Sequence, residues 1–276
     1  MNINLMTLME NIVCNNGKDI NYLIERNIIN IDDITNEVIG FGNLEYIYNF
    51  AYYVRGANIA KLEDAIINKK DARYIYSFAK VVKGANIVKL EDAIINSNNS
   101  MYIYYFAKNM KGANIVKLED AIINTNDAEY LYYFTIDVKG ANIVKLEDAI
   151  INTNDARFIY YFARDIKGAN IVKLEDAIIN TNDSMYIYYF AKNVKGANIN
   201  ITKLTDAIMM IGNYENICLI REYLKQSKIN KKNSLLELVH NNGIAVKENE
   251  EEIQKLVKSN NKSKTKILIK EEKIDE

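Results

Sequence analysis

The chain has 276 residues, 35 basic and 36 acidic side chains for a net charge of −1, and no proline or tryptophan. A charge balance this close excludes a strong overall field toward nucleic acid or a membrane surface. Proline averages roughly 5% of residues in proteins, so its absence indicates helices joined by short glycine, asparagine and aspartate turns.

Apolar residues nowhere form a run of roughly 18, so no membrane span is predicted. The first residues, MNINLMTLMENIV, lack the basic region and the continuous apolar stretch of a signal peptide. Cys14 and Cys218 are far apart in sequence and are expected to be small, buried residues of a reduced protein. We therefore expect a soluble, cytoplasmic protein.

A unit of 28 residues, close to GANIVKLEDAIINTNDARYIYYFAKDVK, occurs five times in the middle of the chain. A fixed period of this size predicts a stacked array in which each unit buries its apolar face against its neighbours. In chain order we expect an N-terminal cap over 1–27, a degenerate repeat over 28–55, five near-identical repeats over 56–195, a degenerate repeat and C-terminal cap over 196–246, and a charged helix with a disordered tail over 247–276. The five copies are Gly56–Lys83, Gly84–Lys111, Gly112–Lys139, Gly140–Lys167 and Gly168–Lys195.

Each unit is predicted to form a helical hairpin. In the third copy, Asn114 is an N-cap residue before a helix over 115–124, and Asp127 caps a second helix over 128–139. Apolar residues recur at spacings of three and four along both helices, so each has one buried face. The glycine that opens the next copy is expected to adopt a left-handed backbone at the helix end. The fold class is therefore all-α, an α-solenoid of about seven two-helix repeats with degenerate caps.

The unit resembles the short HEAT-like repeats first named from the phycobilisome lyases. Those repeats show Leu-x-x-Ala-Leu, an acidic turn, and a second helix of small and apolar residues that ends in glycine. Here the matching places hold Leu118, Ala121, Ile122, Asp127 and Gly140. The resemblance covers about residues 56–225, and it implies the fold without implying an activity. Tyrosines stand in the second helix where that family often has arginine and small residues.

A glutamate on the first helix of each copy lies between apolar residues, on the side that faces the adjacent repeat. A buried carboxylate must be paired or hydrogen-bonded. We therefore predict that each glutamate joins a tyrosine hydroxyl or a lysine of an adjacent unit, and that this contact fixes the register of stacking. These glutamates are Glu63, Glu91, Glu119, Glu147 and Glu175.

Differences between the copies cluster on one face of the second helix, opposite its apolar stripe, whereas the first helix is nearly constant. Second helices commonly line one broad surface of a solenoid, so variation confined there indicates a surface adapted to a ligand. Drift of any exposed face is the alternative. The candidate partner-binding residues are Arg73, Lys80, Met101, Tyr105, Lys108, Glu129, Tyr133, Arg157, Tyr161, Arg164, Met185, Tyr189 and Lys192. A further variable slot on this face holds Val81, Asn109, Asp137, Asp165 and Asn193.

Three aromatic rows run along the second helices. The rows that contain Tyr130 and Tyr132 flank the apolar stripe, so they are expected to pack against the next repeat. The row that contains Tyr133 points outward. It is the better candidate for recognition, because an exposed tyrosine gives a large contact area at a small loss of side-chain entropy.

The residues that catalysis and metal binding usually need are scarce. His240 is the only histidine, and the two cysteines have no metal-ligand spacing. Gly40-Phe41-Gly42 lacks the further glycine and the strand context of a phosphate-binding loop. We therefore expect neither an enzyme nor a protein that uses a metal or cofactor.

Three functions fit these observations. The favoured one is a protein-interaction module, an adaptor or inhibitor, that binds a protein or peptide along the outward face of the second helices. The alternative is a nucleic-acid binder, because six basic residues oppose three acidic ones on the variable slots beside a row of tyrosines; some HEAT-like solenoids bind DNA. The interrupting acidic residues and a pI of about 6.1 count against it. The third is a purely structural or self-assembling role, through incomplete capping at an end of the array. The chain itself is expected to be a monomer or to associate weakly with itself.

Overall fold

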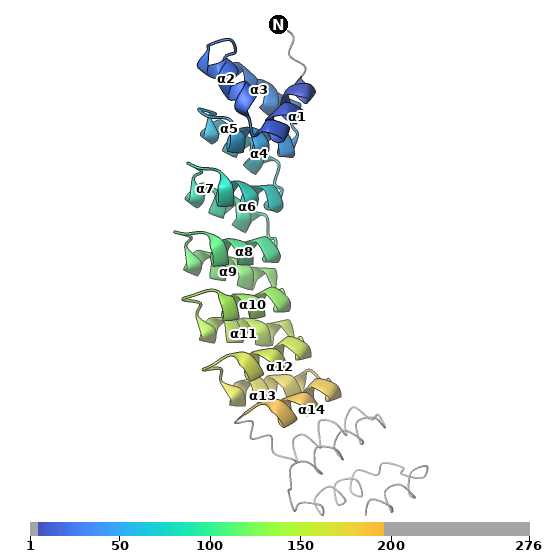
Figure 1. Ribbon diagram of the computed structural model, residues 1–276. Coiled ribbons are helices and arrows are strands. Elements are labelled where there is room, and N and C mark those ends of the chain that lie inside the picture. Colours follow the sequence, from blue (N-terminus) through green and yellow to red (C-terminus); the bar gives the residue numbers. More distant parts are fainter. Residues whose placement is uncertain (1–4, 196–276) are drawn as a thin grey trace, which may run out of the picture.

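A computed structural model describes residues 5–195 of the chain. Within this range the protein is all-α, with fourteen helices and no strand. The helices stack into an elongated, gently bent body (Figure 1). The protein is an α-solenoid of about seven two-helix repeats, as the sequence period predicts. The expected C-terminal repeat, cap and tail lie outside the described residues.

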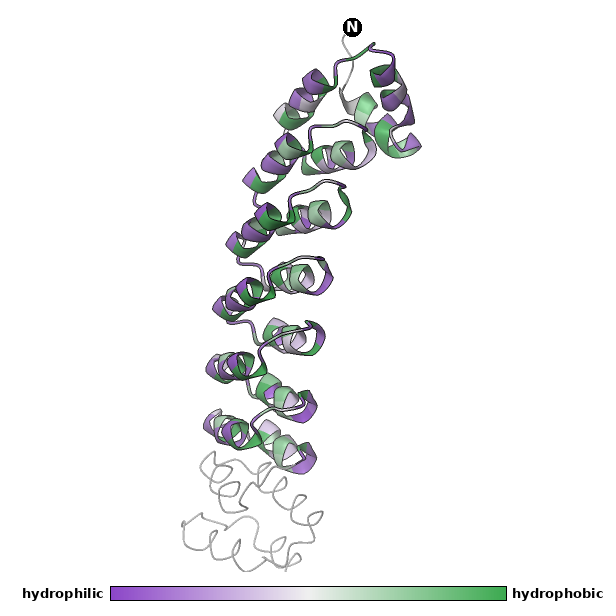
Figure 2. Cartoon of the chain, turned by 90° about the vertical axis from the view of Figure 1, so that its left-hand side faces the viewer, coloured by the Kyte–Doolittle hydropathy of each residue, from purple (hydrophilic) through white to green (hydrophobic). Residues whose placement is uncertain are grey.

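Helices of like position contact one another along the stack, so the molecule consists of two columns of helices (Figure 2). We call the two helices of each repeat helix one and helix two. The N-terminal pair is α1 (Leu5–Asn15) and α2 (Lys18–Glu25), and the degenerate repeat is α3 (Ile31–Phe41) and α4 (Leu44–Tyr53). Helix one of the five copies is α5 (Ile59–Asn68), α7 (Ile87–Asn96), α9 (Ile115–Thr125), α11 (Ile143–Thr153) and α13 (Ile171–Asn180). Helix two is α6 (Ala72–Val81), α8 (Ser100–Asn109), α10 (Ala128–Asp137), α12 (Ala156–Asp165) and α14 (Ser184–Asn193).

Both predicted N-caps of the third copy are confirmed. The Asn114 side chain accepts a hydrogen bond of 3.2 Å from the backbone N–H of Lys117, in the first turn of α9. Asp127 accepts one of 3.3 Å from the backbone N–H of Tyr130, in the first turn of α10. Between the helices, Asn126 has a φ of 53°, a left-handed conformation that asparagine tolerates better than most residues.

The end of helix two differs from the prediction. Helix α10 stops at Asp137, and Val138 is extended, with φ −91° and ψ 113°. The extended backbone directs the Val138 side chain into the core, where it is buried, and burial of that apolar group favours ending the helix early. Gly140 has the expected positive φ of 90°, but it lies in the turn beyond this extended residue and is not the cap.

The core lies between the two columns. One phenylalanine of helix two in each copy is fully buried there, and Phe50 takes the same place in the degenerate repeat. The predicted stripe of α10 is confirmed, because Leu131 and Phe134 are buried and Thr135 is half-buried. Figure 2 shows hydrophobic residues gathered between the columns and hydrophilic residues on the outside. At the N-terminal end, α1 packs against α4.

The buried glutamates of helix one contact the adjacent repeat, as predicted, but their main partner is a backbone amide. Glu119 is only 4% exposed. Its Oε2 accepts a hydrogen bond of 2.6 Å from the backbone N–H of Asn142, and its Oε1 lies 3.7 Å from the Lys145 ammonium. Of the two predicted alternatives, a tyrosine hydroxyl or a lysine, the lysine is the one found for Glu119, and the hydrogen bond from the backbone amide was not predicted. Asn142 caps the next helix one, whose first amides have no partner within the helix and favour a negative charge.

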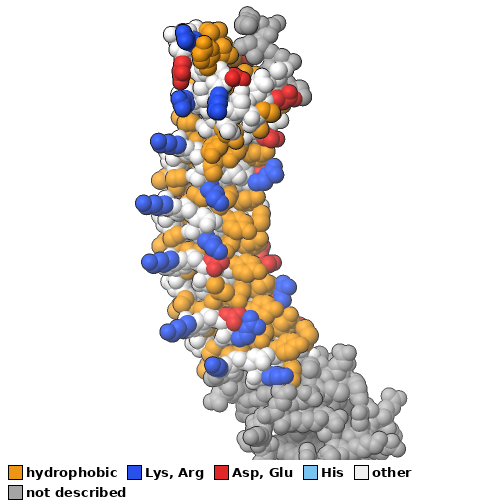
Figure 3. Space-filling view, in the orientation of Figure 1, with side chains coloured by type: hydrophobic (Ala, Val, Ile, Leu, Met, Phe, Trp, Pro, Cys, Tyr) orange, Lys and Arg blue, Asp and Glu red, His pale blue; other side chains and the backbone are white. Residues whose placement is uncertain are grey.

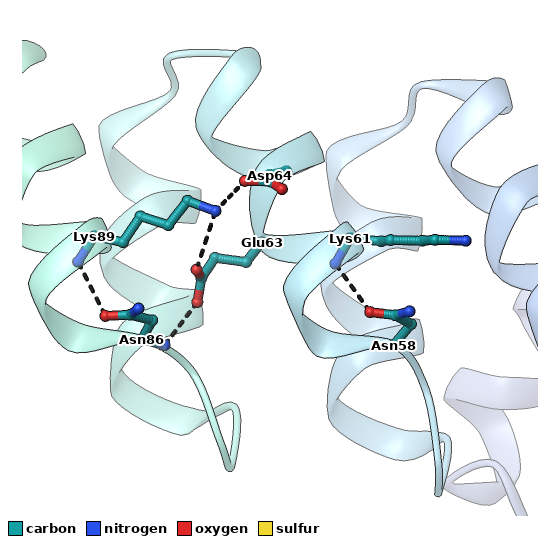
Figure 4. Close-up of polar contacts among 6 residues, drawn as sticks. All are labelled: Asn58, Lys61, Glu63, Asp64, Asn86 and Lys89. Carbon is teal, nitrogen blue, oxygen red and sulfur yellow. Dashed lines mark hydrogen bonds and ion pairs between the residues drawn. The ribbon is translucent and has the colours of Figure 1, made fainter.

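The same arrangement connects the first two copies (Figure 4). Glu63 accepts from the backbone N–H of Asn86 at 2.7 Å, and Lys89 contacts both Glu63 and Asp64. In the degenerate repeat the glutamate slot holds Thr35, whose hydroxyl donates to the backbone carbonyl of Ile31 at 2.7 Å. The series of carboxylate contacts therefore begins at Glu63.

Candidate interaction surface

The outward side of α6, α8, α10, α12 and α14 is called the helix-two face below. Hydrophobic side chains form a continuous column along the repeats, with basic side chains on both of its sides (Figure 3). Each predicted partner-binding residue lies on one of these helices, and all are exposed except Met101 and Tyr161, which are half-buried. The residues selected from the sequence pattern therefore all lie on one column of the solenoid.

The aromatic rows form one network of ring contacts across the repeat boundaries. The ring of Tyr132 lies 5.9 Å from both Phe158 and Tyr161 of the next repeat, measured between ring centroids. Tyr104 contacts Tyr130 and Tyr133 in the same way, at 5.9 and 6.1 Å. The predicted packing of the two inner rows is confirmed. The outer row remains partly open to solvent, with exposed fractions of 37% for Tyr105, 37% for Tyr133 and 38% for Tyr189.

Hydroxyl groups of the inner row that contains Tyr132 form hydrogen bonds between neighbouring second helices, in addition to the ring contacts. The Tyr132 hydroxyl donates to the carboxylate of Asp165 in the next repeat at 2.6 Å, and Tyr104 donates to Asp137. Where the slot holds asparagine, the amide donates to the tyrosine hydroxyl, at 3.0 Å for Asn109 to Tyr76 and 3.1 Å for Asn193 to Tyr160. This further variable slot, which holds Asp137 and Asp165 in two of the copies, was expected to face a ligand. A long tyrosine side chain instead crosses the boundary and engages it.

Two basic residues of the face are paired with these aspartates. The Lys108 ammonium lies 2.8 Å from Asp137, and the Arg164 guanidinium lies 2.7 Å from Asp165. Lys108 and the Tyr104 hydroxyl lower the pKa of Asp137 from its usual range, and Arg164 lowers the pKa of Asp165 more than burial raises it. Burial and the hydrogen bond to Asp165 raise the pKa of Tyr132. At neutral pH both pairs are therefore ionised and neutralise each other.

Four other cations of the face have aromatic neighbours in place of carboxylates. Arg73 lies 4.7 Å from the Tyr74 ring centroid, and Arg157 lies 4.4 Å from that of Phe158. Lys80 and Lys192 lie over tyrosines of the inner row at 5.6 and 5.5 Å. Among residues 5–195, none of the four has a carboxylate at ion-pair distance. A cation held against a ring keeps its other side available to a ligand.

A row of lysines that was not among the predicted site residues borders the face. These residues follow the end of each helix two, are exposed, and form no ion pair with a carboxylate of the described chain. The Lys-Gly pair that recurs at each repeat boundary is the sequence signal from which this row could have been found. The row consists of Lys83, Lys111, Lys139, Lys167 and Lys195.

The remaining candidates from the sequence lie away from this face. Cys14 is exposed, not buried as expected, because it falls on the outer side of α1. Cys218 and His240 lie outside the described residues. Between residues 5 and 195, no group of three or more His, Cys, Asp or Glu side chains could hold a metal ion. No helix in that range is long and apolar enough to cross a membrane.

The fold and this surface define an α-solenoid repeat protein with one aromatic, basic face. Comparison of the chain with protein-family models, with curated proteins and with solved structures found no match. The resemblance to the short HEAT-like repeats therefore rests on the sequence pattern of the unit.

Proposed function

We propose that the chain is a non-enzymatic protein-interaction module, an adaptor or an inhibitor, that binds a protein partner along the helix-two face. One observation supports this most: two outward surfaces were duplicated together, and only one has diversified. On helix one, the exposed residues Val88, Val116, Val144 and Val172 are the same in four copies, at 66–68% exposure. On helix two, the corresponding outward slot holds Arg73, Met101, Glu129, Arg157 and Met185.

The diversified surface also has the chemistry of protein interfaces. Aromatic, methionine and arginine side chains are enriched there, and buried tyrosines and arginines often supply most of the binding energy. The tyrosines are held by ring contacts with neighbouring repeats, so a partner would meet them with little further loss of conformational freedom. Preorganised, half-exposed rings are therefore suited to recognition.

Single-stranded nucleic acid is less well supported as the ligand. Stacking on tyrosines beside cations would suit it. However, Asp137 and Asp165 neutralise Lys108 and Arg164, and Glu129 adds an unfavourable charge in the middle of the row. A phosphate backbone carries one charge per nucleotide and would meet all three carboxylates.

The test is affinity capture from a cell lysate with the intact chain and two variants. One variant changes the outer tyrosines (Y105A, Y133A, Y161A and Y189A). The matched control makes the same number of changes on helix one (V88A, V116A, V144A and V172A). We expect a protein that the intact chain and the valine variant retain and the tyrosine variant loses.

Because the tyrosine rings also contact neighbouring repeats, a third variant tests the face while it leaves every ring in place. Arg157→Glu with Lys192→Glu reverses two exposed cations, and circular dichroism checks that each variant folds. The same protein should be lost again. Equal capture by all three variants would refute the proposal, and recovery of nucleic acid that salt releases would favour the alternative.

A further inference from the structure

We infer that the partner segment on the helix-two face is an extended, acidic stretch of polypeptide, with carboxylates toward both ends and an apolar residue near its middle. This inference rests on the proposed function and specifies the chemistry of the partner. It follows from the distribution of charge that remains after the ion pairs of the face are formed.

Unpaired positive charge surrounds the aromatic column. Four exposed cations of the face lie over aromatic rings. The predicted site contains only one carboxylate, that of Glu129, to offset their charge. The lysines that border the face add a cation at every repeat boundary. Because these charges are exposed and partly desolvated by rings, an anionic ligand gains attraction along the whole column.

The charge is uneven along the stack. The first copy has Arg73 and Lys80 without carboxylate partners, and the last two copies have Arg157 and Lys192. In the middle copy the lysine slot holds Ile136, which is 49% exposed, and the arginine slot holds Glu129. A complementary ligand is therefore acidic toward its ends and apolar at its centre.

The dimensions fit a short extended segment. Neighbouring helices pack about 8–10 Å apart, and an extended chain advances about 3.3 Å per residue. One repeat therefore corresponds to about three residues of an extended peptide. The four repeat steps from Lys80 to Lys192 correspond to a segment of roughly ten to twelve residues.

A polypeptide fits the uneven pattern better than a nucleic acid. Its side chains change from residue to residue, so it can present a carboxylate to Arg157 and an apolar group to Ile136. Regularly spaced phosphates cannot avoid Glu129. The tyrosine row would pack against the backbone and apolar side chains of the segment, as paratope tyrosines do.

The probe is a library of displayed random peptides of about twelve residues, selected on the intact chain. We expect enriched peptides with aspartate or glutamate toward both ends and apolar residues in the middle. In fluorescence polarisation, Lys80→Glu with Lys192→Glu should weaken an enriched peptide about tenfold or more, because two exposed ion pairs are lost. Lys18→Glu with Lys61→Glu makes the same charge change away from the face and should leave the affinity unchanged.

The double reversal at Lys80 and Lys192 should also change the selection itself, from acidic to basic peptide ends. Enriched peptides that are neutral or basic, yet lose affinity for the tyrosine variant, would overturn this inference and leave the proposed function standing. Peptides that bind the tyrosine variant as well as the intact chain would count against both. A library that yields no enriched peptide would also overturn the inference.

Discussion

The buried carboxylate of Glu119 accepts a hydrogen bond of 2.6 Å from the backbone N–H of Asn142, the residue that caps helix one of the next repeat. Equivalent bonds join Glu63 to Asn86, Glu91 to Asn114 and Glu147 to Asn170. The constant residues of helix one thus hold the stack in register. The helix-two column could diversify without disturbing these contacts.

Removal of this carboxylate should be costly. Glu119→Ala leaves the Asn142 amide without its acceptor, which we expect to destabilise the array by about 2–3 kcal/mol. Glu119→Gln retains an acceptor and should cost about 1 kcal/mol. The exposed Glu129→Ala serves as the control and should change stability by less than about 0.5 kcal/mol. Urea unfolding followed by circular dichroism measures all three, and equal midpoints for the Glu119 and Glu129 variants would contradict the account.

The tyrosine hydroxyls at the repeat boundary should contribute unequally to the free energy of unfolding. Tyr132→Phe removes the donor to Asp165 and should cost about 1–2 kcal/mol. Tyr130→Phe is the matched control, because Phe158 fills the same slot in the next copy. It should be nearly neutral in the same unfolding measurement. A loss for Tyr132→Phe no larger than the loss for Tyr130→Phe would show that the hydroxyl of Tyr132 does not stabilise the boundary.

Acid should weaken the contacts made by Asp137 and Asp165. Their pKa values are lowered in the folded chain, so their stabilisation is present above the unfolded pKa, about 3.9, and is lost as pH falls through the lower folded value. Asp137→Asn with Asp165→Asn retains a side chain that can bond the tyrosine, as Asn109 and Asn193 do. This variant should be less stable than the natural chain at neutral pH.

The difference in stability between the natural chain and this double variant should shrink below about pH 4. Thermal unfolding midpoints across this range measure it, and comparison within the pair cancels the titration of other carboxylates. A difference that stays constant down to about pH 2 would refute the assignment, because protonation of the two aspartates in the unfolded chain, at a pKa of about 3.9, must by then have reduced it.

The repeat is also an exchangeable unit. Deletion of residues 112–139 would bring Glu91 to the amide of Asn142, an interface chemically the same as the one removed. The shortened chain should fold, with a modest drop in unfolding midpoint because one interface is lost. Deletion of residues 112–125 alone removes one helix and should abolish cooperative unfolding. Similar unfolding curves for both deletions would contradict a register fixed by the glutamates.

Local signals made most of the fold predictable. The period, the caps Asn114 and Asp127, and the apolar spacing give the hairpin unit directly. The end of helix two was not predictable, because the extended conformation of Val138 depends on burial between repeats. The partner of Glu119 was not predictable either. Helix periodicity places its carboxylate at the repeat boundary, but only the packing of the next repeat shows that the backbone amide of Asn142 lies there.

The candidate surface was predictable as a set of positions and less so as chemistry. Helical angles placed Tyr133 outward, and it is exposed. Those angles could not show that Tyr104 reaches Asp137 across a repeat boundary, or that Lys108 is neutralised there. Contacts between residues about thirty positions apart depend on superhelical packing, which a single repeat does not encode.

Site-specific photo-cross-linking can show whether a protein binds the helix-two face. A photoreactive benzoylphenylalanine replaces Tyr133 on the helix-two face in one chain and Val144 on helix one in another, and both are irradiated in lysate. We expect a discrete protein adduct from position 133 and none from position 144. Adducts from position 144 alone, or nucleic acid attached at position 133, would contradict this expectation.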